Sequence, residues 1–156
     1  MGINLGLDIG AISLKLAAVP CGTPDGPTAA EDRQVLEALC AAHPQFRMAG
    51  FGALPMVLSE YRRIAGSPIQ ATYDLLHEFY DGVPAERVEG IRVTGSGSRT
   101  IAKVLGLFFE NEFKAIATMV AAFYPEVRTI FEIGGESSRY IRLENGVIVD
   151  YDRSGE

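Results

Sequence analysis

The chain contains few cysteines, no long apolar run and no excess of basic residues, and each absence excludes a class of protein. Cys21 and Cys40 are too few for a disulfide framework or a closed metal site, so we predict two unpaired structural thiols. No stretch reaches the roughly 18 apolar residues of a membrane span, and no basic segment precedes the first predicted strand, so we expect a cytoplasmic protein without membrane contact. The formal net charge of -6 argues against a general nucleic-acid binder, which needs a basic surface.

Two common nucleotide-binding motifs are also missing. The chain has no P-loop with its Gly-Lys-Ser ending, and the glycine-serine turn at residues 94–98 lacks the spacing of a dinucleotide fingerprint. That turn still runs from a predicted strand into a predicted helix, where free N–H groups bind anions. The remaining composition, 47% hydrophobic and 22% charged in 156 residues, predicts about one domain with an ordinary core.

The most informative stretch is an alternating hairpin at residues 3–17. Apolar side chains at every second position alternate with Asp8 and glycines, which is the period of a β-strand, and a second alternating run follows at once. At the tip, Gly10 leaves room for backbone N–H groups to approach a ligand, Ser13 adds a hydroxyl and Lys15 adds a positive charge. Asp8 is placed to hold Mg²⁺ through water. A surface hairpin with solvated charges is the alternative interpretation.

Residues 129–141 repeat this design. A hydrophobic strand with Glu132 near its end is followed by Gly134, Gly135, two serines and Arg139, and then by an alternating return strand. Two such hairpins facing each other would clamp a polyphosphate. A further hairpin is predicted after them, because Asn-Gly at residues 145–146 separates two strand-like runs.

The two hairpins resemble the paired phosphate loops of the actin-like ATPase superfamily, which includes sugar kinases, actin and heat-shock chaperones. Four motifs in order, at residues 7–15, 93–99, 111–112 and 132–139, are similar to those of one family within it. That family comprises the ATP-dependent activators of 2-hydroxyacyl-CoA dehydratases and the related ATPase subunits of benzoyl-CoA reductase. The similarity covers residues 3–19 and roughly 56–151, leaving the middle unmatched.

The resemblance assigns roles to individual residues of this chain. Those expected to contact phosphates are Gly10, Ser13, Lys15, Gly134, Gly135 and Ser138. Asp8 and Glu132 would organise Mg²⁺ and its waters, and Glu136 would orient the attacking water, since phosphoryl transfer needs chiefly positioning and charge compensation. Glu112 is either a carboxylate of the nucleotide site or a residue that complements the dipole of its helix. Ala11 and Ser137 depart from the family, which usually has a hydroxyl and an aspartate there.

The predicted fold is an α/β, ribonuclease-H-like domain of the actin-like ATPase type: a mixed sheet with a three-strand antiparallel meander and flanking helices. We expect a first lobe at residues 1–124 and the opening strands of a second, truncated lobe at residues 125–156. Residues 20–54 are interpreted as an insertion, predicted to be a surface helix over a sheet edge. A docking element carrying Phe46, Met48 and Phe51 is the alternative.

The function implied by the resemblance is an ATP-hydrolysing activator, of which this chain is the N-terminal nucleotide-binding part. ATP and Mg²⁺ are the implied ligands, a dehydratase or reductase is the implied partner, and a homodimer is left open. The cysteines that hold the family's iron-sulfur cluster would lie downstream of this stretch. A sugar or small-acid kinase of the same superfamily and a degenerate, non-hydrolysing regulatory or interaction module are the alternatives, and Ala11 and Ser137 favour the latter.

Overall fold

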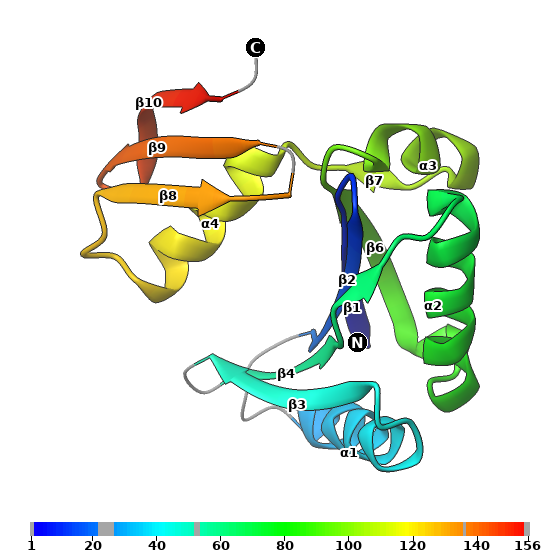
Figure 1. The fold of residues 1–156 in the computed structure, drawn as a ribbon. Coiled ribbons are helices and arrows are strands. Elements are labelled where there is room, and N and C mark those ends of the chain that lie inside the picture. The colour runs from blue at the N-terminus through cyan, green and yellow to red at the C-terminus, as the bar shows by residue number, and fades with distance from the viewer. Residues whose placement is uncertain (1, 22–26, 52–53, 136, 155–156) are drawn as a thin grey trace. The chain divides into compact units, whose positions relative to one another are not determined.

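The computed structural model describes residues 2–21, 27–51, 54–135 and 137–154. The chain divides into two compact units, residues 1–109 and 110–156, and each contains its own β-sheet (Figure 1). The two units are described separately below.

The sheet of the first unit is mixed. Its described strands are β1 (Ile3–Ile9), β2 (Ser13–Pro20), β3 (Phe46–Phe51), β4 (Leu54–Ser59), β5 (Arg62–Arg63), β6 (Val88–Thr94) and β7 (Phe108–Phe109). Their order is β3-β4-β2-β1-β6-β7, and β5 pairs with the first two residues of β2. The antiparallel β1–β2–β4 meander and the parallel β1–β6 pair are the arrangement that the sequence predicts for a ribonuclease-H-like domain.

Three helices accompany this sheet: α1 (Pro27–Ala42), α2 (Pro68–Gly82) and α3 (Ser98–Leu105); a short 3₁₀ turn covers Ala85–Arg87. The sequence Ser67-Pro68-Ile69-Gln70 predicts a capped helix start with proline at the first helical position. This start of α2 is confirmed, because the Ser67 side chain accepts a hydrogen bond from the Gln70 N–H at 3.3 Å and Pro68 occupies the first turn. Helix α3 ends at Gly106, whose positive φ of 64° is a conformation that glycine adopts without strain.

Strand β1 separates a core face from a polar face. Leu5, Leu7 and Ile9 are at most 3% exposed and pack with apolar residues of all three helices, whereas Asp8 lies on the opposite face. Burying one such leucine or isoleucine contributes roughly 1.5–3 kcal/mol. The helix side of the sheet therefore holds the first unit together and leaves the other side for polar groups.

The region interpreted as an insertion also contributes to the sheet. Strand β3 lies inside it and pairs along its whole length with β4, which in turn pairs with β2. Phe46, considered above as a docking residue, is 2% exposed and makes an edge-to-face contact with Phe79 of α2. Met48 of the same strand is 36% exposed. The segment is thus an edge strand plus a helix, with its first aromatic residue in the core.

The second unit consists of β8 (Thr129–Ile133), β9 (Ser138–Glu144) and β10 (Val147–Arg153), packed on α4 (Glu112–Phe123). Its core is small: Ala117, Val120, Ile141 and Leu143. The predicted Asn-Gly turn is present, with positive φ values of 51° at Asn145 and 77° at Gly146. Helix α4, which we placed in the first lobe from sequence, packs on the sheet of this unit.

The described helices can be compared with the length and apolar character of a membrane-spanning helix. None of them combines the length and the apolar character that crossing a bilayer requires.

Candidate functional site

The polar face of the first hairpin brings two predicted site residues together. Asp8 and Lys15 are direct cross-strand partners on β1 and β2, and the Lys15 Nζ lies 3.6 Å from the Asp8 Oδ2. Both side chains are half exposed, at 49% and 51%. An ion pair so open to solvent is worth less than about 1 kcal/mol, so a ligand of higher charge can displace it at small cost.

The turn of this hairpin is closed by its own backbone. The Gly10 N–H donates to the Ser13 carbonyl at 2.8 Å. The Gly10 N–H is therefore already used, and any N–H group offered to a phosphate must come from further along the turn. A Cβ at Gly10 would lie 3.3 Å from the Ser13 carbonyl oxygen, so the absent side chain keeps this narrow turn open.

The glycine-serine turn after β6 supports the first hairpin. The Gly97 N–H donates to the Ile9 carbonyl at 2.9 Å, and the Ser98 N–H and hydroxyl both bond to the Gly95 carbonyl. A Cβ at Gly95, where φ is +102°, would lie 2.3 Å from the Ile9 carbonyl oxygen. The prediction that the turn offers free N–H groups to an anion is wrong for Gly97 and Ser98, because both bond within the protein.

The second hairpin repeats the first position by position. Glu132 of β8 is the direct cross-strand partner of Arg139 of β9, as Asp8 is of Lys15. The Gly134 N–H donates to the Ser137 carbonyl at 2.9 Å, as Gly10 does to Ser13. A Cβ at Gly134 would lie 3.0 Å from that carbonyl oxygen. Each hairpin therefore presents a carboxylate, a glycine turn and a cation in the same order.

The two hairpins differ in how far their charges are already paired. Arg139 contacts the carboxylates of both Glu132 and Glu112, and its side chain is only 10% exposed. The two glutamates are 32% and 17% exposed, and the guanidinium also lies 5.9 Å from the ring centroid of Phe113. Its buried Nε has no hydrogen-bond partner among the residues that the structure describes. We refer to Glu112, Arg139 and Glu132 as the arginine network.

The arginine network bears on the predicted magnesium residues. Mg²⁺ usually takes one or two carboxylates together with water and phosphate oxygens. Asp8, half exposed and weakly paired, fits this chemistry, whereas one carboxylate oxygen of Glu132, Oε2, already accepts a hydrogen bond from Arg139. Among the described residues, no group of three or more His, Cys, Asp or Glu side chains is placed to hold a metal ion.

The remaining predicted residues of the second hairpin take different positions. The Ser138 N–H donates to the Ser154 hydroxyl at 2.8 Å, so the residue that follows β10 secures this end of the hairpin. Gly135 lies in the exposed turn, and Glu136 lies outside the described residues.

Two residues beside the first hairpin were not found from sequence. Tyr61 lies with its ring centroid 5.9 Å from the Lys15 Nζ, and Arg63 of β5 is the cross-strand partner of Ser13. A hollow of about 250 Å³ lies next to them, lined mainly by residues 59–63. From sequence we expect a strand over Met56 to Tyr61, with Tyr61 at its last position, and no motif marks the two-residue strand Arg62–Arg63 that follows.

Comparison of the sequence with protein-family models finds no match, and neither does comparison with curated proteins. Solved structures do match. Component A of (R)-2-hydroxyglutaryl-CoA dehydratase from Acidaminococcus fermentans aligns with a TM-score of 0.62 at 16% identity, over 99% of this chain and 48% of that one. The activator of 2-hydroxyisocaproyl-CoA dehydratase from Clostridium difficile, solved with bound ADPNP, aligns with a TM-score of 0.60 at 18% identity, over 97% and 45%. The chain has the actin-like ATPase fold.

Other structures with this fold align as well. A Ppx/GppA phosphatase from Aquifex aeolicus gives a TM-score of 0.57 at 13% identity, over 98% of this chain and 52% of that one. The ethanolamine utilization protein EutJ from Carboxydothermus hydrogenoformans gives 0.59 at 12% identity, over 99% and 52%. The chain thus spans about half the length of the structures with the actin-like fold that it matches, and the predicted ribonuclease-H-like fold class is confirmed.

Proposed function

We propose that this chain is the N-terminal nucleotide-binding part of an ATP-hydrolysing activator that drives electron transfer to a 2-hydroxyacyl-CoA dehydratase or a similar reductase. The observation that carries the proposal is the repeated hairpin, in which a carboxylate, a closed glycine turn and a cation recur in the same register. The likeness to two dehydratase activators, together with the order of the four sequence motifs, supports the proposal.

In this proposal the first hairpin binds the phosphates of ATP. Ser13 donates its hydroxyl to a phosphate oxygen, and Lys15 exchanges its weak pairing with Asp8 for a contact with phosphate. Asp8 would hold Mg²⁺ through water, and the metal would supply charge compensation for the phosphates. The half exposure of both side chains supports these roles, because neither must leave a buried partner to reach a ligand.

The second hairpin has phosphate-contacting residues of its own in this proposal. Gly134, Gly135 and Ser138 would contact phosphate, and Glu136 would orient the attacking water. For Glu132 to organise Mg²⁺ as well, it would have to exchange Arg139 for the metal, and Glu112 would then hold Arg139 alone. We therefore assign the principal magnesium role to Asp8. The iron-sulfur cluster, the dehydratase or reductase partner and a homodimer are parts of the proposed whole protein to which no residue of this chain is assigned.

The test uses two single changes, with ATP and adenosine as ligands. Lys15→Ala should weaken ATP more than adenosine, because it removes a charge directed at phosphate and leaves base contacts untouched. Asp8→Asn should chiefly reduce the dependence of binding on Mg²⁺. Isothermal titration with ATP and with adenosine measures the first effect, and titration with ATP in the presence and absence of Mg²⁺ measures the second. Equal losses for ATP and adenosine in Lys15→Ala would show that this hairpin does not bind phosphate.

A non-hydrolysing regulatory or interaction module is the second candidate. The arginine network favours it, because Arg139 already neutralises two carboxylates that an active site would use. Such a module would bind nucleotide and release no phosphate. A phosphate-release assay on the whole protein, with the Asp8→Asn variant as background, separates the candidates: turnover above that background supports the ATPase, and its absence alongside measurable ATP binding supports the module.

A further inference from the structure

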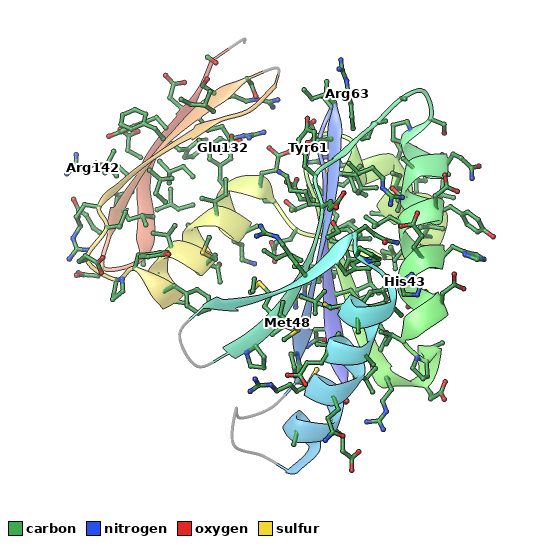
Figure 2. The ribbon with its side chains drawn as sticks, turned by 60° about the horizontal axis from the view of Figure 1, so that its bottom comes forward. His43, Met48, Tyr61, Arg63, Glu132 and Arg142 are labelled. Atoms are coloured by element: carbon green, nitrogen blue, oxygen red, sulfur yellow. The ribbon has the colours of Figure 1, made fainter. Side chains whose placement is uncertain are left out.

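Strand β5 places an arginine directly beside the tip of the first hairpin. Arg63 is the cross-strand partner of Ser13, and the Ile64 N–H continues the pairing by donating to the Ile12 carbonyl at 2.9 Å. Residues 62–64 therefore run antiparallel to residues 12–14, where β2 begins. The tip is consequently flanked by protein on this side, and Figure 2 shows Arg63 at that end of the hairpin.

The alternation of side chains sends the two arginines of β5 to opposite faces of the sheet. Arg62 is opposite the buried Leu14, on the helix side, and its Nη2 lies 2.6 Å from the Oε2 of Glu78 of α2. Arg63 follows it in sequence and must lie on the other face, together with Ser13 and Lys15. One arginine therefore secures the helix, and the other adds charge to the polar face.

The residue before these arginines contacts Lys15. The Lys15 Nζ lies 5.9 Å from the ring centroid of Tyr61, within the range of a cation–π interaction, and 3.6 Å from the Asp8 carboxylate. Lys15 is thus held between a carboxylate and an aromatic ring. Because Tyr61 belongs to the same segment as Arg63, one short connection positions both cations of this face.

The charges on the polar face are not balanced. Lys15 is matched by Asp8, whereas Arg63 is exposed and forms no ion pair with any acidic residue in the part of the chain that the structure describes. A planar guanidinium can donate two parallel hydrogen bonds to one phosphate group. An anion that already contacts Ser13 and Lys15 would therefore gain from Arg63 in proportion to its number of charged phosphates.

We propose that Arg63 and Tyr61 form a side wall of the phosphate site, in which Arg63 binds the terminal phosphate of a nucleoside triphosphate and Tyr61 positions Lys15. This inference rests on the proposed nucleotide function. It assigns to the first hairpin a preference for triphosphate over diphosphate, set by a residue outside both phosphate turns.

The experiment is a nuclear magnetic resonance titration of the 156-residue chain, because backbone amide shifts report even millimolar binding. The ligands are ATP, ADP and inorganic triphosphate, each with Mg²⁺. Arg63→Ala should weaken ATP and triphosphate two- to fivefold and ADP by less than twofold, which is the range for an exposed charge pair. Arg47→Ala, a change to an exposed arginine of β3, is the matched control and should leave all three affinities unchanged.

The remaining variants distinguish the possible failures. If Lys15→Ala weakens ATP and Arg63→Ala does not, the side wall is wrong and the phosphate site stands. If the wild-type chain binds none of the three ligands up to roughly 20 mM, more than tenfold weaker than millimolar binding, the phosphate site of the proposed function fails and the side wall with it. Equal losses from Arg63→Ala and Arg47→Ala would show unspecific attraction and overturn the inference.

Tyr61 has its own test. Tyr61→Leu should weaken triphosphate about twofold, and Tyr61→Phe, which retains the ring, should restore wild-type affinity. A loss in the Phe variant equal to that in the Leu variant would show that the ring does not position Lys15. The amide spectra without ligand check that every variant remains folded.

Discussion

Replacing Arg139 with methionine tests the arginine network most directly. Methionine keeps much of the side-chain volume and removes the charge, so the carboxylates of Glu112 and Glu132 lose their common cation. Because Arg139 is 10% exposed and the two glutamates are 17% and 32% exposed, water compensates them only in part. The free energy of opening, that is, of locally unfolding, the second unit should therefore fall, with no direct effect on the first unit.

The expected magnitude follows from burial. Removing one partner of a fully buried ion pair costs about 3–5 kcal/mol. The partial exposure of Glu132 reduces this, and we expect a loss of about 2–3 kcal/mol in the free energy of opening the second unit. That is a large change for a unit whose buried core is four residues, Ala117, Val120, Ile141 and Leu143. It corresponds to a fall of roughly 30- to 150-fold in amide protection.

Native-state hydrogen exchange of the β8 and β9 amides measures this loss, and the amides of β1 and β6 provide an internal reference. Arg142→Met is the matched control: it lies on the same strand, its pair with Glu144 is 2.9 Å long, and both side chains are more than half exposed. It should cost less than about 1 kcal/mol. Equal losses of protection in the Arg139 and Arg142 variants would refute the reasoning. It would also be refuted if adding Glu132→Gln to Arg139→Met did not reduce the loss of protection.

Three further changes test other features. Gly95→Ala should lower the free energy of unfolding by more than about 2 kcal/mol, because its Cβ would lie 2.3 Å from a carbonyl oxygen of β1. The control, Gly106→Ala, has a positive φ but open space around it and should lower the free energy of unfolding by only about 1 kcal/mol. Equal losses in the two variants would contradict the steric argument. A hydrogen bond from Arg62 lowers the pKa of Glu78, so its carboxylate stabilises the fold above its unfolded pKa and less as pH falls. Glu78→Gln should therefore cost about 1 kcal/mol at pH 7 and nothing below about pH 3 in urea titrations, and a pH-independent cost would exclude this linkage. Ile133 is 83% exposed on the edge strand β8 and should promote self-association. Ile133→Lys should therefore lower the sedimentation coefficient at high protein concentration without lowering the midpoint of thermal unfolding. An unchanged sedimentation coefficient would exclude self-association through this edge.

The sequence predicted those elements whose determinants are local. Alternation located the two hairpins, Ser67 and Pro68 located the start of α2, and Asn145-Gly146 located a turn that needs positive φ. The fold class followed from the order of these elements and from the resemblance. The partnership of Asp8 with Lys15 was also accessible, because the register of a two-strand hairpin is set by its turn.

The features that sequence reasoning missed depend on partners distant in the chain. Strand β3 lies between Pro44 and a glycine-rich stretch, which favour a loop, and it forms because β4 offers a free edge. Arg139 was taken only as a basic residue of its hairpin, since nothing in the local pattern shows that Glu112 of another element would reach it. Tyr61 and Arg63 carry no motif at all, and only the pairing of β5 with β2 brings them to the tip.

The hydrogen bond from Gly97 to Ile9 has a consequence for the order of folding. The β1–β2 hairpin is local and can form in about 1–10 μs, but Gly97 reaches Ile9 only after β6 has paired in parallel with β1. Such non-local pairing is slow, because the closure entropy of the intervening chain is lost before the contact forms. We therefore expect the first hairpin to appear early as a mobile ribbon and to acquire its fixed tip late. During synthesis, the tip of the first hairpin should therefore stay mobile until both β6 and Gly97 have left the ribosome.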